Sequence, residues 1–144
     1  MSSNRLLVPL YNADPTFDAV EFVLDTYPEA SVTVLYVIDP FESDHEGLVP
    51  PLLGYWGAWY ESARLTANDV LDRATSLVND RACSVTTDVI HGRAPGAIAG
   101  YAEAKDIDHV VVAPHRSSRL RRMLSGGVVL GVVRNAPVPV TVVK

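Results

Sequence analysis

Cysteine is almost absent from the 144-residue sequence, in which Cys83 is the single example. One thiol forms no internal disulfide, and no Cys or His stands near it at metal-ligand spacing, so we expect a buried strand thiol in a reduced, cytoplasmic protein. The sequence also lacks an apolar run of the roughly 20 residues that span a bilayer. Its first 15 residues, MSSNRLLVPLYNADP, lack the long apolar core of a signal peptide. We therefore expect a soluble, unprocessed protein without membrane contact.

The motifs of common catalytic sites are missing as well. The sequence contains no Gly-x-Ser-x-Gly elbow, no P-loop and no recognisable pair of catalytic carboxylates. Ser117 and Ser118 follow His115 closely, but neighbours in sequence do not make a base-activated nucleophile. His45 and His109 have no partners at metal-ligand spacing. We expect neither an enzyme nor a metal site.

Lysine is scarce, with two residues against ten arginines, and the charges are unevenly distributed. Residues 1–112 hold all 17 acids and six bases, a net charge of -11, whereas residues 113–144 hold six bases and no acid. The acidic balance and the absence of aromatic residues among the arginines disfavour nucleic acid as a partner. A local anion site near the arginines fits the polarity.

Apolar segments alternate with helical patterns along the whole chain, which is long enough for one globular domain over residues 1–144. Asp14 followed by Pro15 is typical of a helix start, because the carboxylate caps the helix and the ring needs no N–H at the first position. Residues 40–56, rich in Pro and Gly, predict a long loop. The expected strands cover residues 5–10, 31–39, 83–90, 109–114 and 138–143, and the expected helices cover residues 14–27, 60–79, 95–105 and 126–134.

This alternation predicts an α/β fold of three layers, α/β/α, with a five-stranded parallel sheet of the Rossmann-like kind. The ligand crevice of such a sheet lies beyond the carboxyl ends of its strands, where the strand order reverses. We expect the loops at 11–14, 39–56 and 113–127 to meet there.

Pro137 precedes the last expected strand, residues 138–143, and Pro139 lies within it. Proline donates no ladder hydrogen bond, so this strand belongs at a sheet edge. A hydrophobic edge needs a cover, and a two-fold partner that pairs the same strand would supply it. We expect a homodimer through residues 138–143; the alternative is an edge already blunted by the two prolines.

Four arginines, at positions 116, 119, 121 and 122, crowd the stretch APHRSSRLRRMLSGG, residues 113–127. One interpretation is an anion site for a nucleotide, a phosphate or an acidic partner, because unpaired guanidinium groups repel one another. The other is a solvated loop that pairs with acids from elsewhere, such as residues 42–46.

Residues 47–60, GLVPPLLGYWGAWY, combine two tryptophans and two tyrosines with leucines. On a surface, such density marks a docking site for a protein partner. The alternative is that the segment folds over the crevice or into the dimer contact. In that case we expect Tyr11 and Trp56 to fill the space where an adenine would otherwise bind.

Three segments together resemble the universal stress protein (UspA-like) family across the whole chain: RLLVPLYNADPTFDAVEFVLDTYPEASVTVLYVIDP, GRAPGAIAGYAEAKDIDHVVVAP and RSSRLRRMLSGGVVLGVVRNAPVPVTVV. The resemblance implies the UspA type of the adenine nucleotide alpha hydrolase-like fold and a stress-response role. It also implies a crevice that binds ATP in some members through Gly, two residues, Gly, nine residues, Gly and Ser or Thr. Small residues at these places let backbone N–H groups approach the phosphates.

This sequence departs from that pattern. The four motif positions fall on Ala113, Arg116, Gly126 and Gly127, and only Gly126 matches. The aspartate that ATP binders carry after their first strand falls on Tyr11, while Val37 matches the adenine pocket. We expect these residues to line the crevice with His115 and Val128, and we expect a dimeric regulatory or scaffold module without the usual ATP binding. The alternative is a nucleotide sensor in which Arg116 and Gly126–Gly127 hold the phosphates.

Overall fold

The computed structural model describes residues 4–11, 15–39, 56–79, 81–114 and 127–144. Strands and helices alternate through these residues as the sequence predicted. The strands are β1 (Arg5–Leu10), β2 (Ser31–Ile38), β3 (Ser84–His91), β4 (His109–Val112) and β5 (Val140–Val142). The helices are α1 (Asp18–Thr26), α2 (Trp56–Ser76), α3 (Ala94–Ala104) and α5 (Val128–Asn135).

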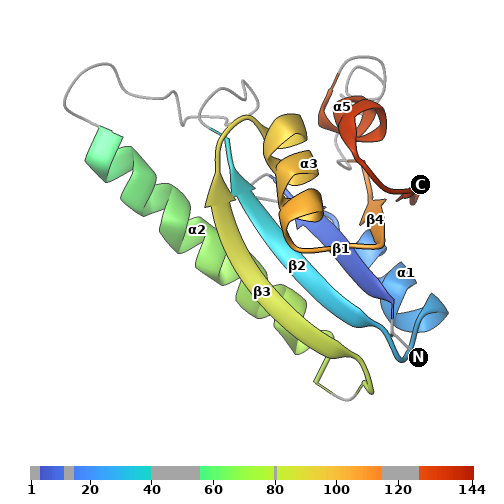
Figure 1. The fold of residues 1–144 in the computed structure, drawn as a ribbon. Coiled ribbons are helices and arrows are strands. Elements are labelled where there is room, and N and C mark those ends of the chain that lie inside the picture. The colour runs from blue at the N-terminus through green and yellow to red at the C-terminus, as the bar shows by residue number, and fades with distance from the viewer. Residues whose placement is uncertain (1–3, 12–14, 40–55, 80, 115–126) are drawn as a thin grey trace.

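The five strands form one parallel sheet in the order β3-β2-β1-β4-β5 (Figure 1). The central strand, β1, is therefore the place where the order reverses, because the chain first builds β2 and β3 on one side and later β4 and β5 on the other. β2 is buried along almost its whole length, as suits a β-branched run between two layers. The predicted five-stranded α/β fold is confirmed.

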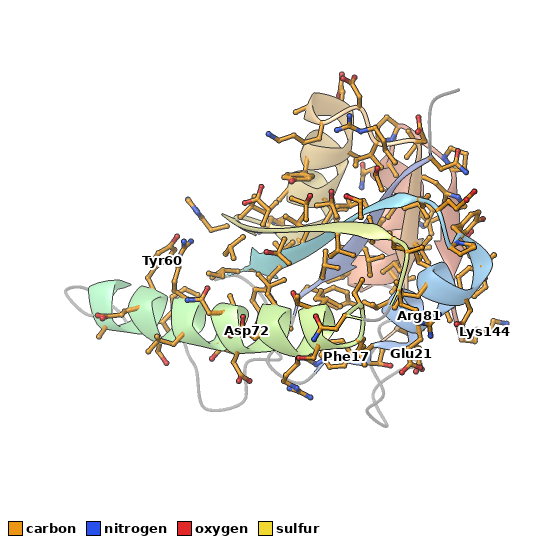
Figure 2. All side chains as sticks on the ribbon, turned by 90° about the horizontal axis from the view of Figure 1, so that it is seen from below. Phe17, Glu21, Tyr60, Asp72, Arg81 and Lys144 are labelled. Carbon is orange, nitrogen blue, oxygen red and sulfur yellow. The ribbon has the colours of Figure 1, made fainter. Side chains whose placement is uncertain are left out.

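Helices cover both faces of the sheet (Figure 1). Successive residues of a strand point to opposite faces, so Leu6 and Val8 of β1 join a buried cluster with α1 and α2, whereas Leu7 joins a second cluster with α3 and α5. Figure 2 shows α2 stretched along one face, with Tyr60 near one end and Phe17 near the other. There the Arg73 guanidinium lies 5.0 Å from the centre of the Phe17 ring.

The first helix begins later than Asp14 and Pro15 predicted. α1 starts at Asp18, whose amide donates to the hydroxyl oxygen of Thr16 at 3.2 Å. Pro15 and Thr16 are buried, so they belong to the segment that packs on the sheet before the helix. The expected start at residue 14 was wrong because the buried Thr16 hydroxyl supplies the local acceptor for the first helical amide.

The second helix begins earlier than predicted, at Trp56 instead of Tyr60. Trp59 is 6% exposed and stands four residues before Ala63 and eight before Ala67, which are also buried. The apolar stripe of α2 therefore continues through Trp59. The expected loop, residues 40–56, overlaps the helix by one residue; residues 40–55 lie outside the described part.

β1 has the predicted bounds, α2 ends three residues earlier than predicted, and the other boundaries differ by at most two residues. The predicted edge position of the last strand is confirmed, since within the described chain β5 pairs only with β4. Cys83 is buried, as expected, but it precedes β3, and its Sγ lies 3.3 Å from the carbonyl oxygen of Pro28.

Candidate functional site

The carboxyl ends of β1 and β4 lie side by side at the switch point, where the sequence predicted a crevice. Tyr11 directly follows β1, and Ala113 directly follows β4. These two strands are neighbours in the sheet although about 100 residues separate their ends in sequence. The topology therefore brings two of the predicted site residues to one edge of the sheet.

The Tyr11 side chain fills this place. Only 4% of Tyr11 is exposed, and its hydroxyl donates to the carbonyl oxygen of Ala113 at 3.4 Å. The ring belongs to the buried cluster of the α3 and α5 layer, which also contains Val37 of β2 and Val128 of α5. Three predicted crevice residues from three elements thus share one apolar cluster. An aromatic ring here offers packing area and one hydroxyl, and no carboxylate oxygen.

A small cavity remains beside Tyr11, with a volume of about 10 Å³. That is roughly the space that one water molecule needs. It lies between the carboxyl end of β1 and the start of α1. The lining residues are Pro9, Leu10, Tyr11, Pro15, Thr16, Ala19 and Ala113.

Gly127, another predicted crevice residue, is the N-cap of α5. Gly127 has φ -94° and ψ -161°, an extended conformation that residues with a side chain also adopt. As a glycine, this N-cap residue has no side chain with which to cap the helix itself. The first helical residue, Val128, is buried in the cluster that holds Tyr11.

The rest of the predicted site lies outside the described residues. This holds for His115, Arg116 and Gly126, and also for Arg119, Arg121 and Arg122. The 42–46 segment, which the alternative interpretation pairs with these arginines, is outside as well. Both interpretations of the arginine cluster therefore stay predictions.

Sequence reasoning did not select Asp39, the buried carboxylate at the end of β2. Asp39 is 3% exposed, and its Oδ2 accepts a hydrogen bond of 2.8 Å from the amide of Ala94, the first residue of α3. An acceptor with negative charge at a helix N-terminus satisfies an amide that has no partner within the helix and interacts well with the helix dipole. The sequence places Asp39 at a strand end, but its partner is 55 residues away.

Histidines outside the crevice have structural neighbours. The ring of His91 contacts Tyr60 edge-on, with centroids 5.7 Å apart. His109 Nε2 lies 2.7 Å from Thr141 Oγ1 and so links β4 to β5. Among the described residues, no three His, Cys, Asp or Glu side chains gather as a metal site would require. No helix in that same part of the chain has the length and apolarity to cross a membrane.

The three-layer fold, with its crevice beside the central strand, defines a class of α/β proteins that place ligands at the switch point. Residues 3–144 match the model of the universal stress protein family, and the chain belongs to that family. The resemblance found in the sequence is confirmed. A universal stress protein of Methanocaldococcus jannaschii is 27% identical over 142 residues, which cover 97% of this chain and 81% of that protein.

Solved structures of the family share the fold. The universal stress protein UspA from Lactobacillus plantarum superimposes with a TM-score of 0.79 at 21% identity, over 100% of this chain and 99% of that one. A universal stress protein from Archaeoglobus fulgidus, solved in complex with dAMP, superimposes with a TM-score of 0.64 at 18% identity, over 100% of both chains. At these identities the likeness concerns the fold.

Proposed function

We propose that this chain is a regulatory or scaffold module of the stress response that does not bind ATP through the glycine motif of its family. The observation that carries the proposal is the buried ring of Tyr11, the residue after β1. Its hydroxyl donates a hydrogen bond to the carbonyl oxygen of Ala113. The resemblance places the nucleoside-binding aspartate of ATP binders at this position. A buried ring there occupies volume and provides no carboxylate for a ribose or an adenine amine.

Calorimetric titration of the intact protein with ATP, ADP, AMP and cyclic AMP tests this proposal. We expect no saturable micromolar binding. Tyr11→Ala, which empties the space of the ring, should gain affinity for AMP, whereas Tyr11→Phe, which keeps the ring, should not. Micromolar ATP binding by the unchanged protein that Gly126→Val abolishes would reject the proposal.

The second candidate is a nucleotide sensor in which Arg116 and Gly126–Gly127 hold the phosphates. Two observations favour it: a relative of the same fold was solved with dAMP, and the N-cap of α5 is Gly127, a residue without a side chain. A helix start with glycine at the N-cap lets an anion approach the backbone N–H groups. Arg116→Ala should then weaken binding, and Arg134→Ala, which removes an exposed arginine in the last turn of α5, serves as the matched control.

We further propose that the module is a homodimer through residues 138–143. Two hydrogen bonds show which residues face β4. The Val110 amide donates to the carbonyl oxygen of Pro139 at 3.0 Å, and the Val143 amide donates to the carbonyl oxygen of Val112 at 2.9 Å. In a parallel strand, the backbone N–H and C=O of one residue point toward the same neighbouring strand, and those of the next residue point to the opposite side. The N–H groups of Val140 and Val142 therefore face the outer edge. Pro139 therefore removes no outward donor, which argues against an edge blunted by this proline.

The proposed partner site in residues 47–60 is narrower than the sequence suggested. Trp59 is buried within α2, so its ring contributes to the core and offers no surface to a partner. A partner would have to recognise the remaining residues of the segment. Deletion of residues 47–55 should abolish capture of such a partner, and the Leu65→Ala variant controls for a general effect on α2, because Leu65 is 66% exposed on the same helix.

A further inference from the structure

Two contacts connect the end of β2 to the start of α3. Asp39 accepts from the Ala94 amide at 2.8 Å, and the Gly92 amide donates to the Ile38 carbonyl at 3.0 Å. Gly92 has φ 142°, a conformation that residues with a side chain rarely adopt. The bond to Asp39 is charge-assisted and buried, which makes it among the stronger hydrogen bonds of a protein. The start of α3 is therefore fixed to the end of β2.

A second close contact connects α3 to α5. A Cβ added at Gly131 would lie 2.6 Å from Cγ and 2.8 Å from Cβ of Pro95. Both distances are below normal contact, and the ring of proline has no rotamer that could move it away. Figure 1 shows α3 and α5 next to each other at the same end of the sheet. Gly131 is therefore the residue that allows α5 to rest against the first turn of α3.

Gly131 is also connected to the start of α5 and to the cluster that contains Tyr11. Its amide donates to the carbonyl of Gly127 at 3.1 Å, one helical turn earlier. Val128, Val129 and Val132 on the same helix are buried in the cluster that contains Tyr11. A displacement of α5 at Gly131 should therefore also shift the start of the helix, because close-packed interiors transmit strain.

We propose that Asp39 and Gly131 are coupled positioning residues: through Ala94 and Pro95, α3 fixes the start of α5 relative to the end of β2. The end of β2 and the start of α5 then respond together when either is disturbed. This coupling goes beyond the proposed function, because it does not depend on which ligand the crevice accepts or on whether it binds a nucleotide. Thermodynamic coupling is reciprocal, so a disturbance at either end must appear at the other.

Amide hydrogen exchange of the full chain, followed by NMR, tests the coupling. Gly131→Ala should accelerate exchange of the Ala94 amide at least about tenfold, as expected for one overpacked contact. Asp39→Asn should accelerate exchange of the Gly131 amide, although Asp39 bonds to α3. Gly100→Ala is the matched control, since a Cβ at Gly100 meets nothing within 4 Å, and it should leave both amides unchanged.

The steric route has its own test. In the double variant Gly131→Ala/Pro95→Gly, the two clashing carbons are gone, so exchange of the Ala94 amide should return toward the rate of Pro95→Gly alone. Acceleration confined to α5 in Gly131→Ala, or to α3 in Asp39→Asn, would overturn the coupling. Equal acceleration throughout the sheet, including the Val34 amide of β2, would also overturn it, because that result indicates a global loss of stability.

Discussion

The hydroxyl of Tyr11 donates a hydrogen bond to the carbonyl oxygen of Ala113 and so joins the residue after β1 to the residue after β4. The two residues lie side by side at the carboxyl ends of β1 and β4. The bond is long, 3.4 Å, whereas the ring is almost completely buried. Packing of the ring, more than the hydrogen bond, should therefore stabilise this edge.

Substitution of Tyr11 separates these two contributions. Tyr11→Phe removes only the hydroxyl and should cost about 0.5 kcal/mol of the free energy of unfolding, at the low end for one hydrogen bond. Tyr11→Ala also leaves a cavity and should cost about 3–5 kcal/mol. Urea denaturation of the three proteins measures both values. Equal losses for the two variants would show that the hydroxyl, and not the ring, is the stabilising group.

The edge strand β5 allows a variant that affects association and spares the sheet. The Val142 amide points away from β4, as the bonds of Pro139 and Val143 indicate, so Val142→Pro removes a donor that only a partner strand would use. We expect sedimentation to show a dimer at micromolar concentration for the native protein and a monomer for Val142→Pro. Pro139→Val, altered on the inward side, should remain dimeric. A native monomer at this concentration would contradict the dimer.

Much of the fold could be predicted because it depends on local patterns. The β-branched run of β2 and the alternation of strand and helix were sufficient for the class of fold, and Pro137 and Pro139 were sufficient for the edge position of β5. The start of α2 was also available, because Trp59 lies four residues before Ala63 and continues its stripe. The Pro- and Gly-rich residues before it concealed that signal.

The contacts of the candidate site could not be predicted in the same way. The bond from Ala94 to Asp39 and the approach of Gly131 to Pro95 join residues that are far apart in sequence. No local pattern distinguishes such an aspartate from any other at a strand end. The position of Tyr11 followed from the resemblance, but its burial against α3 and α5 required the packing of the whole layer.

Gly127 should accept a side chain, because its extended conformation at the N-cap of α5 does not require glycine. Serine at an N-cap accepts a hydrogen bond from the first turn, so Gly127→Ser should stabilise the protein by a few tenths of a kcal/mol, roughly. Gly127→Ala offers no acceptor and should be destabilising. Thermal unfolding of the two variants checks the order. A less stable serine variant would mean that the surroundings of Gly127 exclude a side chain.

Two tyrosines should make the protein sensitive to alkali. Burial raises the pKa of Tyr36 to about 12 from the ordinary value of 10.0. Burial, followed by the hydrogen bond that the Tyr101 hydroxyl donates to Asp88 at 2.9 Å, raises the pKa of Tyr101 to about 12 as well. In the unfolded chain both phenols ionise near their ordinary value. The folded state thus holds these protons more tightly than the unfolded state does.

Stability from these groups is therefore complete below pH 10 and is lost as the pH rises toward 12. For the buried Tyr36 the loss amounts to at most about 3 kcal/mol, from two pKa units. Tyr36→Phe should reduce the fall of unfolding free energy across this interval, as urea denaturation at each pH measures. Tyr27→Phe is the control. A group held neutral by burial must ionise at a higher pH than an exposed one. Phenolate absorbance that appears near pH 10 for all tyrosines of the folded protein would therefore contradict the raised pKa values.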